Sequence, residues 1–392
     1  MATKSLYLVA LAVIGPYLYD RGVTFSGMLA NRPGKFENLN LFKEHQVKFA
    51  QRMRNCEDVL IEEGMGVALV SCNPGRDQWN TVMGTFAPPR PRTNDQDDAH
   101  IWLYDYSTPN LPDSAALKPL TLVDYPNPTD FQPLGIELDA QTSTLYVINH
   151  SRHSGNTLDV FQISPQNASA QYIKTLTHPL LHTPNSIHSL GAGKLLMTND
   201  HYIGALTSPL LSKIETFSSL PGGSVVYVDT HEPARSKKLA HVAFANGITM
   251  LNSTTVAVAS TAKAAVYLYS FDRENVGLTL LKQIRVPFMV DNIAVDSAGK
   301  LLMAGHPFAL GLMVVSKARA RCDAQGGEEA RKACDCTTSS WAAEWSEAEG
   351  VKTLYKNDGS EFCSSSTFAR DAKRNVSIVT GLYDRGLLVA RG

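Results

Sequence analysis

The fold is decided by residues 290–307, which read VDNIAVDSAGKLLMAGHP. An acid and an amide, Asp291 and Asn292, precede an alternating apolar run, a short turn with a glycine and a second apolar run. This order is typical of a strand, a hairpin turn and a returning strand. The unit therefore predicts a β-hairpin whose entrance carries oxygen-bearing side chains.

The same unit recurs along the chain. Residues 185–200 and 246–258 repeat it with a leading asparagine, and residues 135–147 repeat it without the amide. Residues 57–392 divide into six units of roughly 56 residues, the scale of a four-stranded propeller blade. We therefore predict an all-β, six-bladed β-propeller, because a β-sandwich would need hairpins without this recurring entrance.

Composition sets the broad class of protein. The 392 residues are 44% hydrophobic and 19% charged, as in a soluble globular protein. Lysine and arginine total 36, and aspartate and glutamate total 37, so no net charge favours nucleic acid or an anionic membrane surface. Nucleic acid is therefore excluded as a partner.

The N-terminal segment precedes the repeats. Its mostly apolar run is shorter than a membrane span and predicts a secretory signal peptide or an uncleaved signal anchor over residues 1–22. A buried helix or strand is the alternative. Residues 23–54 form an arm with a helical pattern near its end, outside the predicted propeller of residues 55–392. We expect a secreted protein, or one that associates with a membrane through its N-terminal segment.

Two long segments interrupt the repeats. Residues 73–98 are rich in proline and asparagine and longer than loops in compact domains, which indicates a functional or accessory excursion. Residues 317–361 predict an insertion that carries cysteines and a helical pattern from residue 328 to 334. Neither segment has a pattern from which a substrate can be read.

Cysteines and glycosylation sequons fit an oxidising compartment. An even number of cysteines, six, behind an apolar leader favours disulfides as accessory staples. Four of them, Cys322, Cys334, Cys336 and Cys363, either clamp the insertion or are free thiols. Asn167 and Asn252 lie in predicted loops and are the better glycan candidates among the sequons.

Oxygen-bearing residues recur at the entrances of the units. In a propeller these entrances meet near the central channel, so side chains far apart in sequence converge there. Carboxylates and amide carbonyls are the ligands that Ca²⁺ accepts, whereas zinc would require histidine or cysteine at these places. Such residues also close turns by bonding local backbone, but five at equivalent places favour a metal site. The predicted calcium ligands are Glu57, Asn185, Asn246, Asp291 and Asn292.

Eight short segments, from about residue 55 to the C-terminus, resemble the serum paraoxonase/arylesterase family and occur in the family's order. The resemblance implies a six-bladed propeller with two axial calcium ions and a lactonase or arylesterase activity at the upper ion. It assigns the five residues above to the catalytic calcium, and Asp58 and the carbonyl of Ile136 to a structural calcium. The segments are Cys56-Glu57-Asp58, Pro133-Leu134-Gly135-Ile136, Val147-Ile148-Asn149-His150, Asn185-Ser186-Ile187, Thr198-Asn199-Asp200-His201-Tyr202, Phe244-Ala245-Asn246-Gly247-Ile248, Val290-Asp291-Asn292-Ile293 and Gly305-His306-Pro307.

The chain departs from the family pattern at two site positions. Ser186 stands where the family has an aspartate that binds the structural calcium, so it would be a weaker, neutral ligand. Leu134 stands where the family has a histidine proposed as part of a base dyad, and leucine cannot accept a proton. His150 matches the second histidine of that dyad. We therefore expect one calcium site, with a second site in which Ser186 is the weaker ligand. We also expect an active site that is more apolar than the family's, because of Leu134.

A calcium ion with open positions would act as a Lewis acid that polarises an ester or lactone carbonyl for attack by water. We therefore predict a calcium-dependent hydrolase of lactones or aryl esters. One alternative is a non-catalytic, calcium-stabilised propeller that binds a small molecule or protein. Another is a different reaction on the same scaffold, as in gluconolactonase and strictosidine-synthase-like propellers. The candidate catalytic residues are Asp291, His201, His306 and His150.

Overall fold

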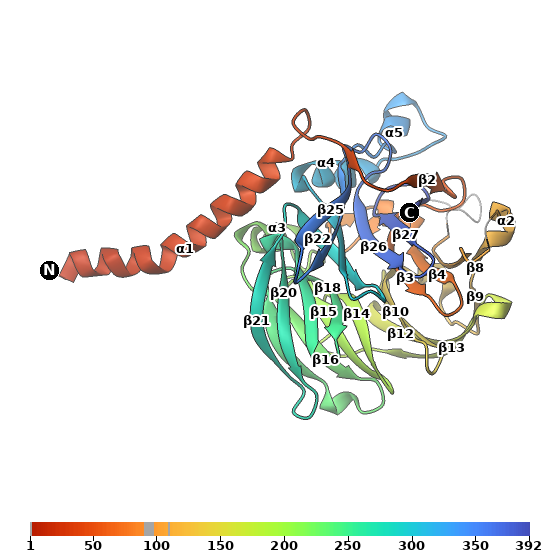
Figure 1. Ribbon diagram of the computed structural model, residues 1–392, viewed down its shortest axis with the longest axis horizontal. Helices are drawn as coiled ribbons and strands as arrows, with labels where there is room; N and C mark the ends of the chain where they lie inside the picture. The colour runs from red at the N-terminus through yellow and green to blue at the C-terminus, as the bar shows by residue number, and fades with distance from the viewer. Residues whose placement is uncertain (1, 90–97, 109) are drawn as a thin grey trace.

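The computed structural model describes residues 2–89, 98–108 and 110–392. These residues form six sheets of four or five strands arranged around one axis, as Figure 1 shows. The innermost strands of the six sheets contact one another in a closed ring. The prediction of a six-bladed β-propeller is confirmed.

The first three blades follow the chain in order, and their consecutive strands pair antiparallel. Blade one comprises β3 (Cys56–Glu62), β4 (Val67–Cys72), β7 (His100–Asp105) and β8 (Leu117–Pro119). Blade two comprises β10 (Pro133–Asp139), β11 (Thr144–Ser151), β12 (Gly155–Ser164), β13 (Ser169–Leu176) and the parallel outer strand β9 (Thr121–Val123). Blade three comprises β14 (Pro184–Gly191), β15 (Lys194–Asn199), β16 (Gly223–Asp229) and β17 (Lys237–Val242).

Of the last three blades, blades five and six each include a strand from the N-terminal arm. Blade four comprises β18 (Ala245–Asn252), β19 (Thr255–Ser260), β20 (Ala265–Asp272) and β21 (Gly277–Arg285). Blade five comprises β22 (Met289–Val295), β23 (Leu301–His306), β24 (Ser340–Ser346), β25 (Gly350–Asn357) and β1 (Leu39–Asn40). Blade six comprises β26 (Ser365–Asp371), β27 (Val376–Gly381), β28 (Leu387–Arg391) and β2 (Glu44–Lys48).

The N-terminal arm closes the ring. β2 pairs antiparallel with β28, from Glu44 opposite Arg391 to Lys48 opposite Leu387. The predicted helical pattern in this part of the arm is wrong, because the edge of β28 offers backbone partners that an isolated segment lacks. The two ends of the propeller sequence are thus held together in one sheet.

Residues 317–361 were predicted to be an insertion, but only part of this segment is inserted between strands of the propeller. Its second half forms β24 and β25, which pair with each other and extend blade five outward. The inserted part lies between β23 and β24 and contains the short helix α5 (Glu328–Lys332), which confirms the helical pattern there. Trp341 and Trp345 are buried in β24 against the core between blades four and five, a tertiary contact that residue spacing alone does not reveal.

Disulfide bonds pair all six cysteines. Cys322 joins Cys334, and Cys336 joins Cys363, so the insertion is clamped within itself and to the start of blade six. The open choice between clamps and free thiols is resolved in favour of clamps. A further bond joins Cys56 to Cys72, which lie opposite each other in β3 and β4.

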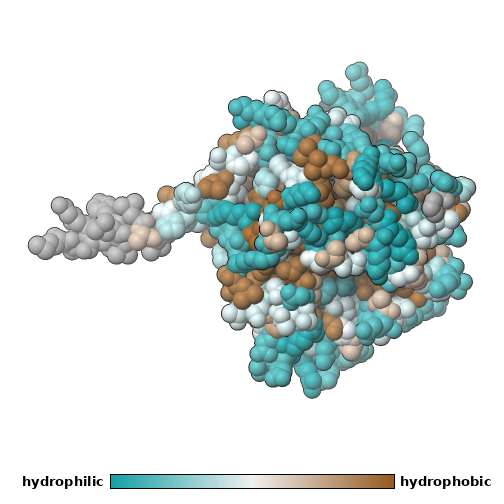
Figure 2. All heavy atoms as spheres, in the orientation of Figure 1, coloured by the Kyte–Doolittle hydropathy of each residue, from teal (hydrophilic) through white to brown (hydrophobic). Residues whose placement is uncertain are grey.

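The N-terminal segment is a helix, α1 (Ala2–Ala30), that contains Pro16. In Figure 1 its start projects away from the propeller, while Arg21 Nη1 near its end donates a hydrogen bond to the Ala262 carbonyl at 2.9 Å. Figure 2 shows a largely hydrophilic face with apolar side chains gathered beside the base of this helix. Among the residues that the structure describes, no helix is both long and apolar enough to cross a membrane.

A β-bulge interrupts every innermost strand at its entrance. The register shifts between Cys56 and Asp58 in β3 and between Val290 and Ile293 in β22, and the other four inner strands shift at the equivalent place. A bulge kinks the strand and re-aims side chains, so consecutive residues can both turn towards the axis. In blades one, three, four and five, the acid or amide of the sequence signature coincides with these bulges.

Candidate active site

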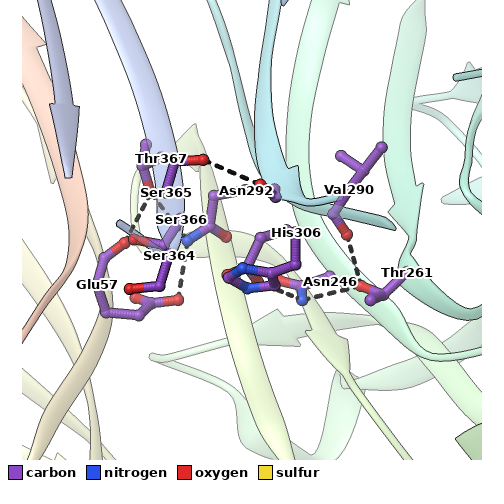
Figure 3. Close-up of polar contacts among 12 residues, drawn as sticks. Glu57, Asn246, Thr261, Val290, Asn292, His306, Ser364, Ser365, Ser366 and Thr367 are labelled. Atoms are coloured by element: carbon purple, nitrogen blue, oxygen red, sulfur yellow. Dashed lines mark hydrogen bonds and ion pairs between the residues drawn. The ribbon is translucent and has the colours of Figure 1, made fainter. Parts of the chain in front are cut away.

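The predicted ligands of blades one, four and five meet at one end of the central channel. Asn292 Nδ2 donates to Glu57 Oε1 at 2.8 Å, and Asn246 Nδ2 donates to an oxygen of Asp291 at 2.6 Å. Figure 3 shows Asn292 between Glu57 and His306, with Asn246 beyond the histidine. The structure therefore brings together residues as far apart in the sequence as 57 and 292.

Four oxygens of the predicted ligand set have no hydrogen-bond partner among the described residues. They are Glu57 Oε2, Asn185 Oδ1, Asn246 Oδ1 and Asn292 Oδ1. Each of these residues is at most 3% exposed. A buried polar oxygen without a partner costs about 1–3 kcal/mol, and a bound cation would offset this cost for the four oxygens.

Negative charge is concentrated at the same place. Burial raises the pKa of Glu57 well above its usual range, and the carboxylates of Asp58 and Asp291 raise it further. Burial also raises the pKa of Asp58, to about 6. Carboxylates that oppose one another in this way are stabilised by a nearby positive charge.

The chemistry of the donors fits calcium. Within the described ranges no group of three or more histidine, cysteine, aspartate or glutamate side chains could hold a metal ion. The predicted set contains only two carboxylates, Glu57 and Asp291, and its remaining donors are amide carbonyls. Hard oxygen donors of this kind, completed by water, are what Ca²⁺ accepts. The residues present therefore fit a calcium ion.

The second, structural site does not fit in the same way. Asp58 Oδ1 accepts from the Val59 N–H at 2.9 Å, and Oδ2 accepts from the Ile136 N–H at 3.0 Å. The Ser186 hydroxyl accepts from the Ile248 N–H at 3.4 Å. The side-chain oxygens of Asp58 and Ser186 are thus satisfied within the protein, so nothing here calls for a second ion.

A hydroxyl that the sequence reasoning missed completes the entrance of blade six. Thr367 Oγ1 lies 3.0 Å from Asn292 Nδ2 and 3.1 Å from Asp58 Oδ1. It lies in the bulge of β26, and Figure 3 shows it near Asn292. The run of small hydroxyl residues from Ser364 to Thr367 marks this entrance in the sequence, but hydroxyls are weak ligands and the run carries no acid or amide.

The candidate histidines lie in different places. His306 Nε2 is 3.0 Å from an oxygen of Asp291, and its Nδ1 is buried without a partner. His201 binds Asp200 and Thr216 instead, at 3.0 and 2.6 Å. Burial lowers the pKa of His201, but the carboxylate of Asp200 more than offsets this, so the net shift is upward.

His150 is held by two hydrogen bonds outside the calcium ligand set. Its Nδ1 lies 2.5 Å from Thr81 Oγ1, and its Nε2 lies 2.7 Å from the Pro184 carbonyl, to which it must donate. Burial lowers the pKa of His150 to about 4. This histidine is therefore neutral and orders the backbone just before Asn185.

A pocket of about 90 Å³ opens above the ligand set. Glu57, Asn246, Asp291 and His306 line it, whereas His150 lines a neighbouring pocket. Three segments contribute to the walls of this pocket. One is the start of the loop predicted at residues 73–98, of which residues 90–97 lie outside the described structure. The other two are helices. These helices are α3 (Pro209–Ser218) and α4 (Ala309–Arg319).

The loop after β4 contributes more to this pocket than its sequence indicated. It contains a 3₁₀ turn (Pro74–Asp77) and the strands β5 (Trp79–Asn80) and β6 (Thr85–Phe86). Arg76, Asn80, Val82 and Met83 line the pocket, together with Leu134 from blade two. No periodic pattern marks these residues, so sequence reasoning identified the excursion but not its side chains.

Comparison with known proteins gives a consistent family. The sequence profile of the Arylesterase family matches residues 94–389. The serum paraoxonase/lactonase 3 of Mus musculus is 30% identical over 284 residues, which cover 71% of each chain. The Homo sapiens protein of the same name is 32% identical over 189 residues, 47% of this chain and 51% of that protein. The match thus spans about half the length of the human relative.

One solved structure supports the fold alone. A luciferin-regenerating enzyme is 12% identical, with a TM-score of 0.51 over 89% of this chain and 95% of that chain. The profile match covers about three quarters of the chain (296 of 392 residues). The alignment with the mouse relative covers 71% of each protein. The chain belongs to the arylesterase family, whose relatives include the serum paraoxonases.

Proposed function

We propose that the protein is a calcium-dependent hydrolase of lactones or aryl esters. The observation that carries this proposal is the set of four buried oxygens without partners, on Glu57, Asn185, Asn246 and Asn292. With Asp291 these residues would hold one calcium ion. The lactonase and arylesterase names of the relatives support the reaction class.

In this proposal the ion, when bound, supplies Lewis-acid polarisation of the substrate carbonyl. The chain supplies the proton acceptor. Asp291 accepts the Nε2 proton of His306, which leaves Nδ1 of the neutral imidazole as an acceptor. Nδ1 has no partner among the described residues, and the histidine lines the pocket. His306 therefore takes a proton from the attacking water, and Asp291 orients the ring.

The other two histidines act by position. His201 is bound by Asp200 and Thr216, and it packs on Phe244 at 4.5 Å between ring centroids. It therefore holds α3 and the entrance of blade four in place. His150 orders Pro184 at the entrance of blade three. We assign both to the support of the site, and Asp291 and His306 to its chemistry.

Apolar side chains also form part of the pocket walls. Leu134, Phe244, Met289 and Leu312 line the pocket beside the carboxylates. They exclude bulk water from the ligand set, which strengthens electrostatic interactions with the substrate carbonyl. Water then adds across the acyl–oxygen bond, which gives one hydroxy acid from a lactone and a carboxylic acid and a phenol from an aryl ester.

The test is hydrolysis of a panel of lactones and aryl esters by purified protein. Turnover should be present with calcium, fall after chelation and return when calcium is added back. Asp291→Asn and Asn246→Ala should both reduce turnover. Full turnover of both variants at saturating calcium would contradict the proposal.

A binding protein without catalysis is the second candidate function. Leu134 favours it, because this leucine is 3% exposed, lines the pocket and supplies no proton acceptor where the family has a histidine. Absence of turnover across the panel, with calcium bound and the protein folded, would support this candidate or a different reaction on the same scaffold.

We also propose passage through the secretory pathway. The support is the pairing of all six cysteines, since disulfides persist mainly in oxidising compartments. The sequon at Asn149 is buried and donates to Tyr125 and Asp159, so it is no glycan site. Asn167 and Asn252 are exposed and stay the predicted glycan positions. The leader over residues 1–22 also stays a prediction.

A further inference from the structure

A buried arginine faces the candidate active site without a carboxylate partner. Arg76 is 3% exposed and lines the pocket with Glu57 and Asp291. Its Nη2 donates to the Pro133 carbonyl at 3.1 Å, its Nε is buried without a partner, and among the described residues it forms no ion pair. One side of the guanidinium is therefore unused by the protein.

Other buried arginines of this chain are paired. Arg319, at 1% exposure, binds Asp77 at 2.9 Å, and Arg21, at 7% exposure, binds Asp20 at 3.0 Å. A buried charge without a partner is strongly destabilising, so proteins pair it or place it for a ligand. Arg76 departs from the pattern of its own fold.

Its neighbour Asp77 is committed elsewhere. Asp77 Oδ2 accepts from Arg54 at 2.7 Å, and Oδ1 accepts from Asn55 at 3.0 Å and from Arg319 at 2.9 Å. These bonds fix the 3₁₀ turn that carries Arg76, so the arginine is held rigidly while the adjacent carboxylate is unavailable to it.

The remaining negative charge near Arg76 belongs to the calcium ligand set. Glu57 and Asp291 attract the guanidinium through space but form no ion pair with it. In the proposed function both carboxylates bind the cation, which cancels their charge. Arg76 then keeps its positive charge beside the proposed calcium ligands, in a pocket that apolar side chains also line.

We propose that Arg76 is the subsite for a carboxylate carried by the substrate, so that the preferred substrates are lactones or esters with a second, free carboxylate. The reaction in this inference rests on the proposed hydrolase function. The binding of the carboxylate rests on the pocket alone. The planar guanidinium matches a carboxylate through two parallel hydrogen bonds. A pocket of about 90 Å³ favours a compact acid over a bulky anion.

The first test compares two ligands on the unmodified protein. The probes are 5-oxotetrahydrofuran-2-carboxylate and the matching neutral 5-oxotetrahydrofuran-2-carboxamide. Hydrogen bonds to a charged group predict that kcat/KM favours the carboxylate by about tenfold or more. Equal values, or a preference for the carboxamide, would overturn the inference.

The second test removes the arginine. Arg76→Met should abolish the preference by raising KM for the carboxylate more than KM for the carboxamide, whereas Arg76→Lys should retain part of the preference. The matched control is Lys213→Met, which removes an equal charge from an exposed position lining the same pocket. An equal loss of preference in both Met variants would assign the effect to the general field and overturn the subsite.

A binding measurement separates this inference from the proposed reaction. Tetrahydrofuran-2-carboxylate and its carboxamide cannot be hydrolysed as lactones, so calorimetric titration reads the subsite directly. Selective binding of the carboxylate that Arg76→Met removes would support the subsite even if no lactone is hydrolysed. Absence of selectivity would overturn it even if neutral lactones are hydrolysed. Should Arg76→Met fail to fold, the ligand comparison on the unmodified protein decides.

Discussion

His306 Nε2 lies 3.0 Å from Asp291 Oδ2 at the floor of the pocket. The two residues stand near the ends of paired strands, β22 and β23, in which Met289 is opposite His306. Asp291 also accepts from Asn246 at 2.6 Å. One carboxylate therefore connects the candidate base to the candidate calcium ligands.

His306→Gln should lower kcat by about 100-fold with little change in KM, because glutamine cannot accept a proton from water. Steady-state kinetics on a lactone with saturating calcium measures this. The control is His231→Gln, which changes an exposed histidine that does not line the pocket. Unchanged kcat in His306→Gln would exclude this histidine as the base.

Calcium should stabilise the fold independently of activity. At an ion concentration of 100 times Kd, binding adds about 2.7 kcal/mol to the free energy of unfolding. Thermal unfolding with calcium and after chelation measures this. Asn185→Ala removes one unpartnered oxygen and should require more calcium for the same stabilisation, whereas Asn252→Ala, an exposed amide, should not. An unfolding midpoint insensitive to calcium would argue against the site.

Gly135 is required by the close approach of blades two and three. A Cβ at this position would stand 2.4 Å from the Asn185 carbonyl oxygen. Gly135→Ala should therefore lower stability by about 1–3 kcal/mol and weaken calcium binding by displacing Asn185. Gly277→Ala is the matched control, because no atom lies within 4 Å of its Cβ. Equal stability of the two variants in denaturant titrations would refute this steric account.

Stability should fall below neutral pH through His150. Its pKa is about 4 in the folded state, against 6.5 in the unfolded chain. Between these values the unfolded state binds more protons, so this stability is present above pH 6.5 and is lost as the pH falls towards 4. The loss from pH 7 to pH 5 is about 2 kcal/mol.

His150→Gln should remove that part of the pH dependence, as measured by denaturant unfolding at fixed calcium. His231→Gln should leave it in place, because this histidine is exposed. If His150→Gln loses as much stability between pH 7 and pH 5 as the unmodified protein does, other groups account for the acid sensitivity.

The buried pair Asp77–Arg319 should dominate the stability of the pocket wall. It joins the loop after β4 to the end of α4 across 242 residues of sequence. Arg319→Met removes one of the two arginines that bind Asp77, which keeps Arg54, and should cost about 1.5–3 kcal/mol. Arg321→Met breaks the exposed pair with Glu329 and should barely move the unfolding midpoint. Similar midpoints for the two variants would contradict this.

The recurring hairpins were predictable because alternation along a strand is a local property. Residues at the entrances, Glu57 and Asn292 among them, were predictable for the same reason, since each stands at a fixed place in its unit. Thr367 was missed because a hydroxyl at an entrance is a weak metal signal. Arg76 was missed because its loop has no period and its orientation depends on Asp77 and on Arg319 far along the chain.

The sequence by itself determined the six blades and the entrance residues that face the axis, because strand period and turn chemistry act over neighbouring residues. Tertiary structure alone decided that β2 closes blade six and that β24 and β25 belong to blade five. It also decided which oxygens are left without partners and that Arg76 lines one pocket with Glu57 and Asn246. These properties depend on contacts between segments hundreds of residues apart, and such contacts exist only once the ring has closed.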